Sequence, residues 1–169
     1  MTSVKRSLTN SPTVPPRRAV WASYAASVWA FAFAAMSIYW ALGGTVGADT
    51  LGDIANFAGN LWFIALVWAT ALVKALGGLL ALALVRPWGR KLPRRLLLAT
   101  VACGGIFMLL YSGANFLARG LMWVGVLDTP EAMHSAAARW HLWFWNPWWL
   151  FGGILFCAAA WQGIRHSRD

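Results

Sequence analysis

The chain alternates between four long apolar runs and shorter polar segments. The runs extend over Ala19 to Leu42, Leu61 to Val85, Leu96 to about Ala118, and Pro147 to Ile164. About 20 helical residues cross the roughly 30 Å hydrocarbon core of a bilayer, and each run reaches or approaches that length. The sequence has no alternating segments of the kind that form a membrane β-barrel. The pattern therefore predicts an all-α fold, a bundle of four transmembrane helices with spans at about 19–42, 56–85, 96–119 and 147–164.

Basic residues predict the orientation of this bundle. Eleven of the fourteen Lys and Arg residues lie before the first run, between the second and third, and after the fourth. The positive-inside rule places these segments, and with them both termini, in the cytoplasm. Composition agrees, because 60% of the 169 residues are hydrophobic and 11% are charged, which is more apolar surface than a soluble domain can bury. The net charge of +9 then reflects topology and attraction to anionic lipid, so no nucleic-acid partner is expected.

The segments outside the runs are expected to be tails and short outer connections. Residues 1–18 are proline-rich and are predicted to be a disordered cytoplasmic tail, and residues 165–169 form a second short tail. On the outer side, Asp49 or Thr50 can begin a helical stretch that runs into the second span. In such a helix four polar residues would share one face: Asp49, Asp53, Asn56 and Asn60.

The second outer segment contains two proline signals for helix starts. Thr129 and Pro130 predict a short interfacial helix as far as about Trp143. Asn146 followed by Pro147 predicts the start of the last span.

Lys74 is the main chemical anomaly of the apolar runs. It lies near the bilayer centre, where an unpaired ammonium costs about 2.5–3.5 kcal/mol. The third run has a polar stripe on one side, and we expect it to face the side of the second helix that carries Lys74. The result would be a wet cleft open to the outside, with Lys74 at its floor. Its walls and mouth would be Asn60, Ser112, Asn115, Arg119, Asp49 and Asp53. The alternative is that these groups only bond to one another between helices.

Tryptophan is concentrated before and within the last run. Five of the 13 lie within ten residues: Trp140, Trp143, Trp145, Trp148 and Trp149. An aromatic belt at the headgroups explains most tryptophans of a membrane protein. This cluster also fits a pocket for an apolar or cationic ligand, with Trp145 and Trp148 as contact residues.

Glu131, His134 and His141 form a second polar set. Two histidines seven residues apart on a helix are too distant to bind one metal ion, so no metal site is predicted, and no motif indicates a cofactor. An interfacial polar face is the simpler interpretation, with proton transfer by His134 or Glu131 as the alternative.

Two short motifs resemble a known family. Tyr39-Trp-Ala-Leu-Gly-Gly44 is followed by Gly47 and Asp49, and Ala138-Arg-Trp140 is followed by Asn146-Pro147. Together they are similar to a bacterial family of small four-helix membrane proteins, domain of unknown function 3995, over most of residues 20–164. The family pattern has an aspartate after the Ala-Arg-Trp run, whereas this chain has His141. The resemblance implies a multi-pass protein of a bacterial cytoplasmic (inner) membrane and no particular activity.

Three functions remain open at this point. The first is binding of an apolar, lipid- or isoprenoid-like molecule in the outward cleft. The second is an enzyme, a membrane-embedded cyclase or isomerase acting on such a molecule by acid/base catalysis, with these candidate residues: Asp53, Glu131, Asp49 and His134. The third is a structural or accessory subunit that associates with itself or with a membrane partner.

Overall fold

Helices account for all the regular secondary structure in the described part of the chain. The computed structural model describes residues 20–51 and 60–165. In chain order the elements are α1 (Trp21–Ala41), the 3-10 helix η1 (Ala48–Leu51), α2 (Leu61–Ala83), the 3-10 helix η3 (Pro87–Lys91), α3 (Arg94–Trp123), the 3-10 helix η4 (Glu131–His134), α4 (Ala136–Trp140), the π-helical η5 (His141–Trp145) and α5 (Asn146–Arg165). The all-α prediction is confirmed for these residues. The predicted N-terminal tail, most of the C-terminal tail, Asp53 and Asn56 lie outside them.

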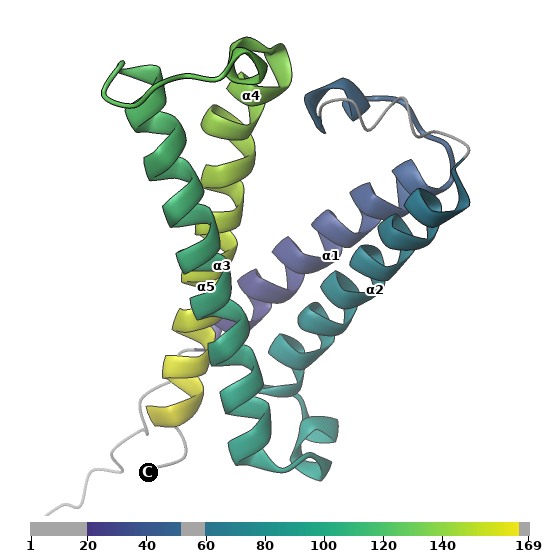
Figure 1. The fold of residues 1–169 in the computed structure, drawn as a ribbon. Helices are drawn as coiled ribbons and strands as arrows, with labels where there is room; N and C mark the ends of the chain where they lie inside the picture. The colour runs from purple at the N-terminus through teal and green to yellow at the C-terminus, as the bar shows by residue number, and fades with distance from the viewer. Residues whose placement is uncertain (1–19, 52–59, 166–169) are drawn as a thin grey trace, which may run out of the picture.

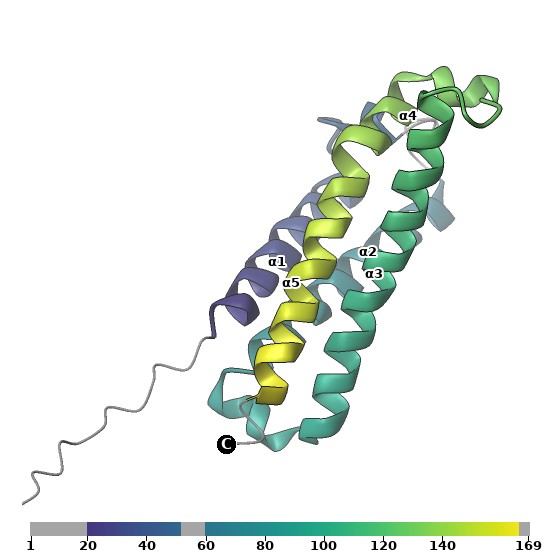
Figure 2. The same cartoon turned by 90° about the vertical axis from the view of Figure 1, so that its left-hand side faces the viewer.

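The long helices form two antiparallel pairs (Figure 1). α1 pairs with α2, and α3 pairs with α5. The pairs meet through α1 and α5, which overlap in Figure 2, near the end that contains the α2–α3 connection. Figure 1 shows that the pairs diverge toward the opposite end. The chain therefore has a closed end, where η3 and the end of α5 lie, and an open end, where η1 and α4 lie.

Three of the described helices are long and apolar enough to cross a membrane: α1, α2 and α3. Most of the surface of α2 is exposed, including apolar side chains such as Leu72 and Val73. Apolar surface of this extent suits lipid and not water. α5 is less apolar, because it contains three tryptophans, Asn146 and Gln162.

Glycines allow the closest helix contacts. A Cβ atom on Gly152 of α5 would overlap the ring of Trp29 on α1. A Cβ on Gly105 of α3 would lie 2.8 Å from Cys157 Sγ of α5, and one on Gly153 would lie 3.0 Å from Gly105 O. Small residues at such crossings let helix backbones approach closely. Gly104 is different, because nothing lies within 4 Å of a Cβ placed there.

The first outer segment differs from the prediction of a helix running from Asp49 into the second span. α2 begins at Leu61, because Asn60 has an extended backbone (φ −77°, ψ 116°) and its side chain accepts the Trp62 N–H at 2.9 Å. This is the usual geometry of an N-cap, so Asn60 itself lies outside the helix. Asp49 belongs to the separate four-residue η1, so Asp49 and Asn60 share no helical face.

The second outer segment also differs from the prediction. The single interfacial helix expected from Thr129 is interrupted at Ser135, which is extended (φ −66°, ψ 156°) and caps α4 by accepting the Ala138 N–H. From α4 onward the helix continues through η5 into α5, because Asn146 has helical angles (φ −64°, ψ −47°) and is no cap. The π turn precedes Pro147, whose ring would collide with the Trp143 carbonyl in a regular α-helix.

Candidate functional site

Lys74 has an unusual environment for a charged side chain. At 1.5 Å per residue it lies about 20 Å from the start of α2 and about 14 Å from its end. Its Nζ donates a hydrogen bond to Ser37 Oγ at 2.6 Å and lies 3.8 Å from the centre of the Phe33 ring. In the described ranges no carboxylate pairs with it. The charge therefore faces α1 and has neutral partners there.

Ser37 is held in position for this contact by a hydrogen bond within its own helix. It is buried, and its hydroxyl donates to the Phe33 carbonyl at 3.2 Å, one helical turn earlier. A hydroxyl has one donor and two acceptor sites, so Ser37 still has lone pairs for the ammonium. The same side of α1 places Ser27 against α2, where its hydroxyl donates to Gly78 O at 2.9 Å. Serines thus supply the polar contacts of an otherwise apolar helix pair.

The ammonium borders a small cavity, which we call the Lys74 pocket. Its volume is about 230 Å³, and α1, α2, η5 and α5 supply its walls. The lining residues are Phe33, Ser37, Trp40, Phe63, Leu66, Val67, Thr70, Lys74, His141, Trp145 and Trp149. Ligand sites usually measure about 300–1,000 Å³. A pocket of this size holds one slender chain or one ring, and a larger molecule would extend out of it.

The π turn gives the pocket its aromatic wall. His141, Trp145 and Trp149 recur at every fourth residue and all line the pocket. Trp145 stacks on Phe33, with 5.9 Å between the ring centres, and its Nε1 donates to Thr50 Oγ1 at 3.2 Å. Because Thr50 belongs to η1, this bond joins the first outer segment to the last helix. This hydrogen bond therefore links the two helix pairs at the open end of the molecule.

The structure does not bring the predicted polar faces of the second and third helices together. The expected cleft between them is wrong, since Lys74 faces α1 and α2 packs mainly against α1. Ser112 is buried and donates to Met108 O in its own helix. Asn115 likewise donates to Tyr111 O at 2.8 Å. Helical periodicity showed correctly that these residues share a side, but not which helix that side meets.

The other predicted residues are scattered. Arg119 and His134 line a second cavity of about 200 Å³ near the open end, where Arg119 donates to Met133 Sδ at 3.4 Å. Glu131 and Asp49 are exposed and line neither this cavity nor the Lys74 pocket.

Two more candidates have structural contacts. Asn60 caps α2, as described above. Trp148 belongs to the aromatic core and stacks on Phe144 at 6.1 Å. Of the predicted set, the Lys74 pocket thus contains Lys74 and Trp145.

Sequence reasoning missed Phe33 and Ser37, whereas Trp149 lies in the tryptophan cluster that was expected to line a pocket. A usable signal existed for Ser37, because the first apolar run contains buried serines at 23, 27 and 37 that fall close to one helical side. Polar groups on one side of a membrane helix indicate a helix neighbour. No comparable signal distinguishes Phe33 from ordinary core aromatics.

Comparison with known families gives one match. The family described as "Protein of unknown function (DUF3995)" matches residues 30–156. The chain belongs to this family. The DUF3995 region includes every residue that lines the Lys74 pocket. Comparisons with curated proteins and with solved structures give no match.

Proposed function

We propose that this DUF3995 protein is a four-span membrane protein that binds one amphiphilic molecule in the Lys74 pocket. The molecule has an apolar, lipid- or isoprenoid-like body and an acidic or other oxygen-bearing head. The single observation that carries this proposal is the ammonium of Lys74, which borders an aromatic cavity and, among the residues that the structure describes, has a hydroxyl and a ring as its partners.

The proposed topology has both termini in the cytoplasm of a bacterial cell. The α2–α3 connection, the start of α3 and the end of α5, which carry most of the described basic residues, lie at the closed end (Figure 1). The open end contains η1 and the segment between α3 and α4, which carry Asp49, Asp128 and Glu131. This distribution follows the positive-inside rule if the closed end is cytoplasmic. The pocket then lies in the outer half of the membrane, because it is lined by the halves of α1 and α2 nearer the open end.

The positive charge of Lys74 determines which ligand head group the pocket favours. A fixed ammonium in an apolar site repels a cation, so the pocket does not suit the cationic ligand that the tryptophans alone suggested. It favours a carboxylate or another oxygen acceptor, which would supply the missing counter-charge through a charge-assisted hydrogen bond. Among the carboxylates that the structure describes, none lines the pocket, so acid/base catalysis by Glu131 or Asp49 gains no support.

The aromatic walls of the pocket favour an apolar ligand body. Five aromatic side chains line the pocket together with leucine and valine: Phe33, Trp40, Phe63, Trp145 and Trp149. Burial of apolar surface against such walls contributes about 25 cal/mol per Å². The body of the ligand is therefore expected to be a flexible or unsaturated hydrocarbon chain.

The test is a titration of the purified protein in non-ionic micelles with parinaric acid, a fluorescent fatty acid that accepts excitation energy from tryptophan. Its methyl ester has the same body and no charge. We expect the acid to bind about tenfold more tightly than the ester, which corresponds to about 1.4 kcal/mol for one charge-assisted bond.

Three variants serve as controls for that titration. Lys74→Met should abolish the preference for the acid, and Lys74→Arg, which keeps the charge, should retain much of it. Asn115→Ala, outside the pocket, should bind as the parent does. Equal affinity for acid and ester in the parent protein would contradict the proposed head, and absence of saturable binding of either would contradict the pocket.

A further inference from the structure

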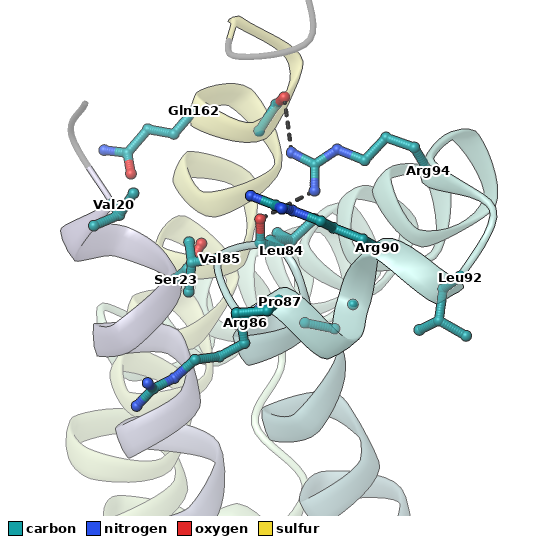
Figure 3. A pocket seen from close by; sticks show the side chains of 13 residues that line it. Val20, Ser23, Leu84, Val85, Arg86, Pro87, Arg90, Leu92, Arg94 and Gln162 are labelled. Atoms are coloured by element: carbon teal, nitrogen blue, oxygen red, sulfur yellow. Dashed lines mark hydrogen bonds between the residues drawn. The ribbon is translucent and has the colours of Figure 1, made fainter.

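The largest cavity that we describe lies at the opposite end of the molecule from the Lys74 pocket. We call it the basic-end cavity, and its volume is about 470 Å³. The start of α1, the end of α2, η3 and the end of α5 surround it (Figure 3). Three arginines line it, and none of its described lining residues is acidic.

Arg94 has a structural role in the wall of this cavity. Its guanidinium donates to Leu84 O at 3.0 Å and to Gly163 O at 3.2 Å (Figure 3). These carbonyls lie at the C-terminal ends of α2 and α5, where a cation is favourable. Arg94 therefore ties two helix ends together while its positive charge stays at the cavity surface.

Arg90 has no comparable structural contact within the described residues. Its side chain is exposed and extends across the cavity toward the guanidinium of Arg94 (Figure 3). Two cations that converge on one cavity repel each other unless an anion lies between them. Arg86 borders the same cavity, with its guanidinium 5.7 Å from the Tyr24 ring. The cavity thus has the charge of an anion site, in which Arg90 is the group left to bind the ligand.

Exposed tryptophans indicate where the cavity lies relative to the membrane surface. Trp21, Trp88 and Trp161 are exposed at the closed end, at the start of α1, in η3 and near the end of α5. Exposed tryptophans collect at the level of the lipid headgroups. In a membrane the basic-end cavity therefore lies at headgroup level, where phosphate groups are abundant.

From this geometry we propose that the basic-end cavity binds a phosphate group, with Arg90 as its direct ligand and Arg94 as a fixed cation behind it. Guanidinium and phosphate pair through two parallel hydrogen bonds, a geometry that Arg90 can provide and a lysine could not. The phosphate comes from an anionic lipid headgroup or from free phosphate, and the two sources share this chemistry. The proposal does not depend on the Lys74 pocket.

Native mass spectrometry of the full chain, released from a non-ionic detergent, tests this site. The probes are short-chain phosphatidylglycerol, which is anionic, short-chain phosphatidylcholine, which is zwitterionic, and inorganic phosphate as a competitor. Arg90→Gln removes the proposed ligand. Arg95→Gln removes the same charge from the same basic segment, but Arg95 is exposed and does not line the cavity. Arg94 is left unchanged because its bonds hold the fold.

We expect phosphatidylglycerol to bind more tightly than phosphatidylcholine, Arg90→Gln to weaken that binding about tenfold, and Arg95→Gln to change it less than about twofold. Displacement by inorganic phosphate would show that the site also accepts free phosphate. Lack of displacement would assign it to lipid, and both results support the proposal. Equal losses in the two variants, or equal binding of the two lipids by the parent, would overturn it.

Discussion

The contact between Lys74 and Ser37 can be tested by a double-mutant cycle. Ser37→Ala removes the hydrogen-bond partner of an ammonium 2.6 Å away and leaves the charge in an apolar pocket. Leaving a donor unsatisfied costs more than removing both partners. Ser37→Ala should therefore destabilise the parent protein strongly, and the Lys74→Met variant only slightly.

The magnitude of this coupling follows from the type of bond. Hydrogen bonds between membrane helices contribute about 0.6 kcal/mol on average and at most about 1.7 in direct measurements. The bond from Lys74 is charge-assisted and shorter than an ordinary N–H···O bond of about 2.9 Å. It should lie near the upper end of that range, so we expect a coupling free energy of about 1.5 kcal/mol between the two substitutions. The loss of the bond from Ser37 to Phe33 O occurs in both backgrounds and cancels in the cycle.

The assay is reversible unfolding in mixed micelles with increasing dodecyl sulfate, followed by circular dichroism. Ser27→Ala provides the matched control, because Ser27 is also a buried serine of α1 that bonds to α2, but at the Gly78 carbonyl. Its effect should add to that of Lys74→Met within about 0.5 kcal/mol. A coupling below about 0.5 kcal/mol for Ser37, or an equal coupling for Ser27, would refute the reasoning.

Two further predictions concern the packing of the fold and its topology. Gly152→Leu should lower the free energy of unfolding by about 1–3 kcal/mol in the same assay, because any side chain there meets the Trp29 ring. Gly104→Leu, which faces open space, should change it little, and equal effects of the two substitutions would contradict the α1–α5 contact. In a cysteine-free background, a membrane-impermeant maleimide added to intact cells should label Asp128→Cys and should label Lys91→Cys only after the membrane is opened; the reverse pattern would contradict the proposed orientation.

The positions of the helices could be predicted from the sequence because they depend on local patterns. The apolar runs correspond to the helices found, since each run supplies enough lipid-compatible surface for one helix. The chain also showed that Lys74 requires a polar neighbour, because an isolated ammonium at that depth is costly. These conclusions need only composition, spacing and length.

The partner of Lys74 could not be predicted in the same way. Periodicity tells which residues share a side of α2, but the choice between α1 and α3 as its neighbour depends on how both helix pairs pack. The serines of α1 indicate that this helix has a helix neighbour, but serine is small and common in membrane helices, so they do not identify Ser37 as the partner of Lys74. The polar side of α3 was wrongly predicted to face Lys74, since Ser112 and Asn115 bond to carbonyls of their own helix.

The proline signal at Pro147 was ambiguous for a physical reason. Proline is favourable in the first turn of a helix and is also tolerated inside one when a local widening removes the clash with an earlier carbonyl. The structure contains the second arrangement, with the π turn His141–Trp145 just before it. That turn supplies two lining residues of the Lys74 pocket, His141 and Trp145, so the local irregularity that sequence reasoning could not resolve lies at the candidate site.

Photolabelling tests the central claim, occupancy of the Lys74 pocket, most directly. The purified protein is irradiated with a photoreactive fatty acid, with and without an excess of unlabelled fatty acid, and the modified peptides are sequenced by mass spectrometry. We expect saturable labelling at pocket residues such as Val67 and Trp149, which the excess prevents and Lys74→Met reduces. Labelling spread over exposed apolar residues such as Leu72, unchanged by the excess, would contradict the account.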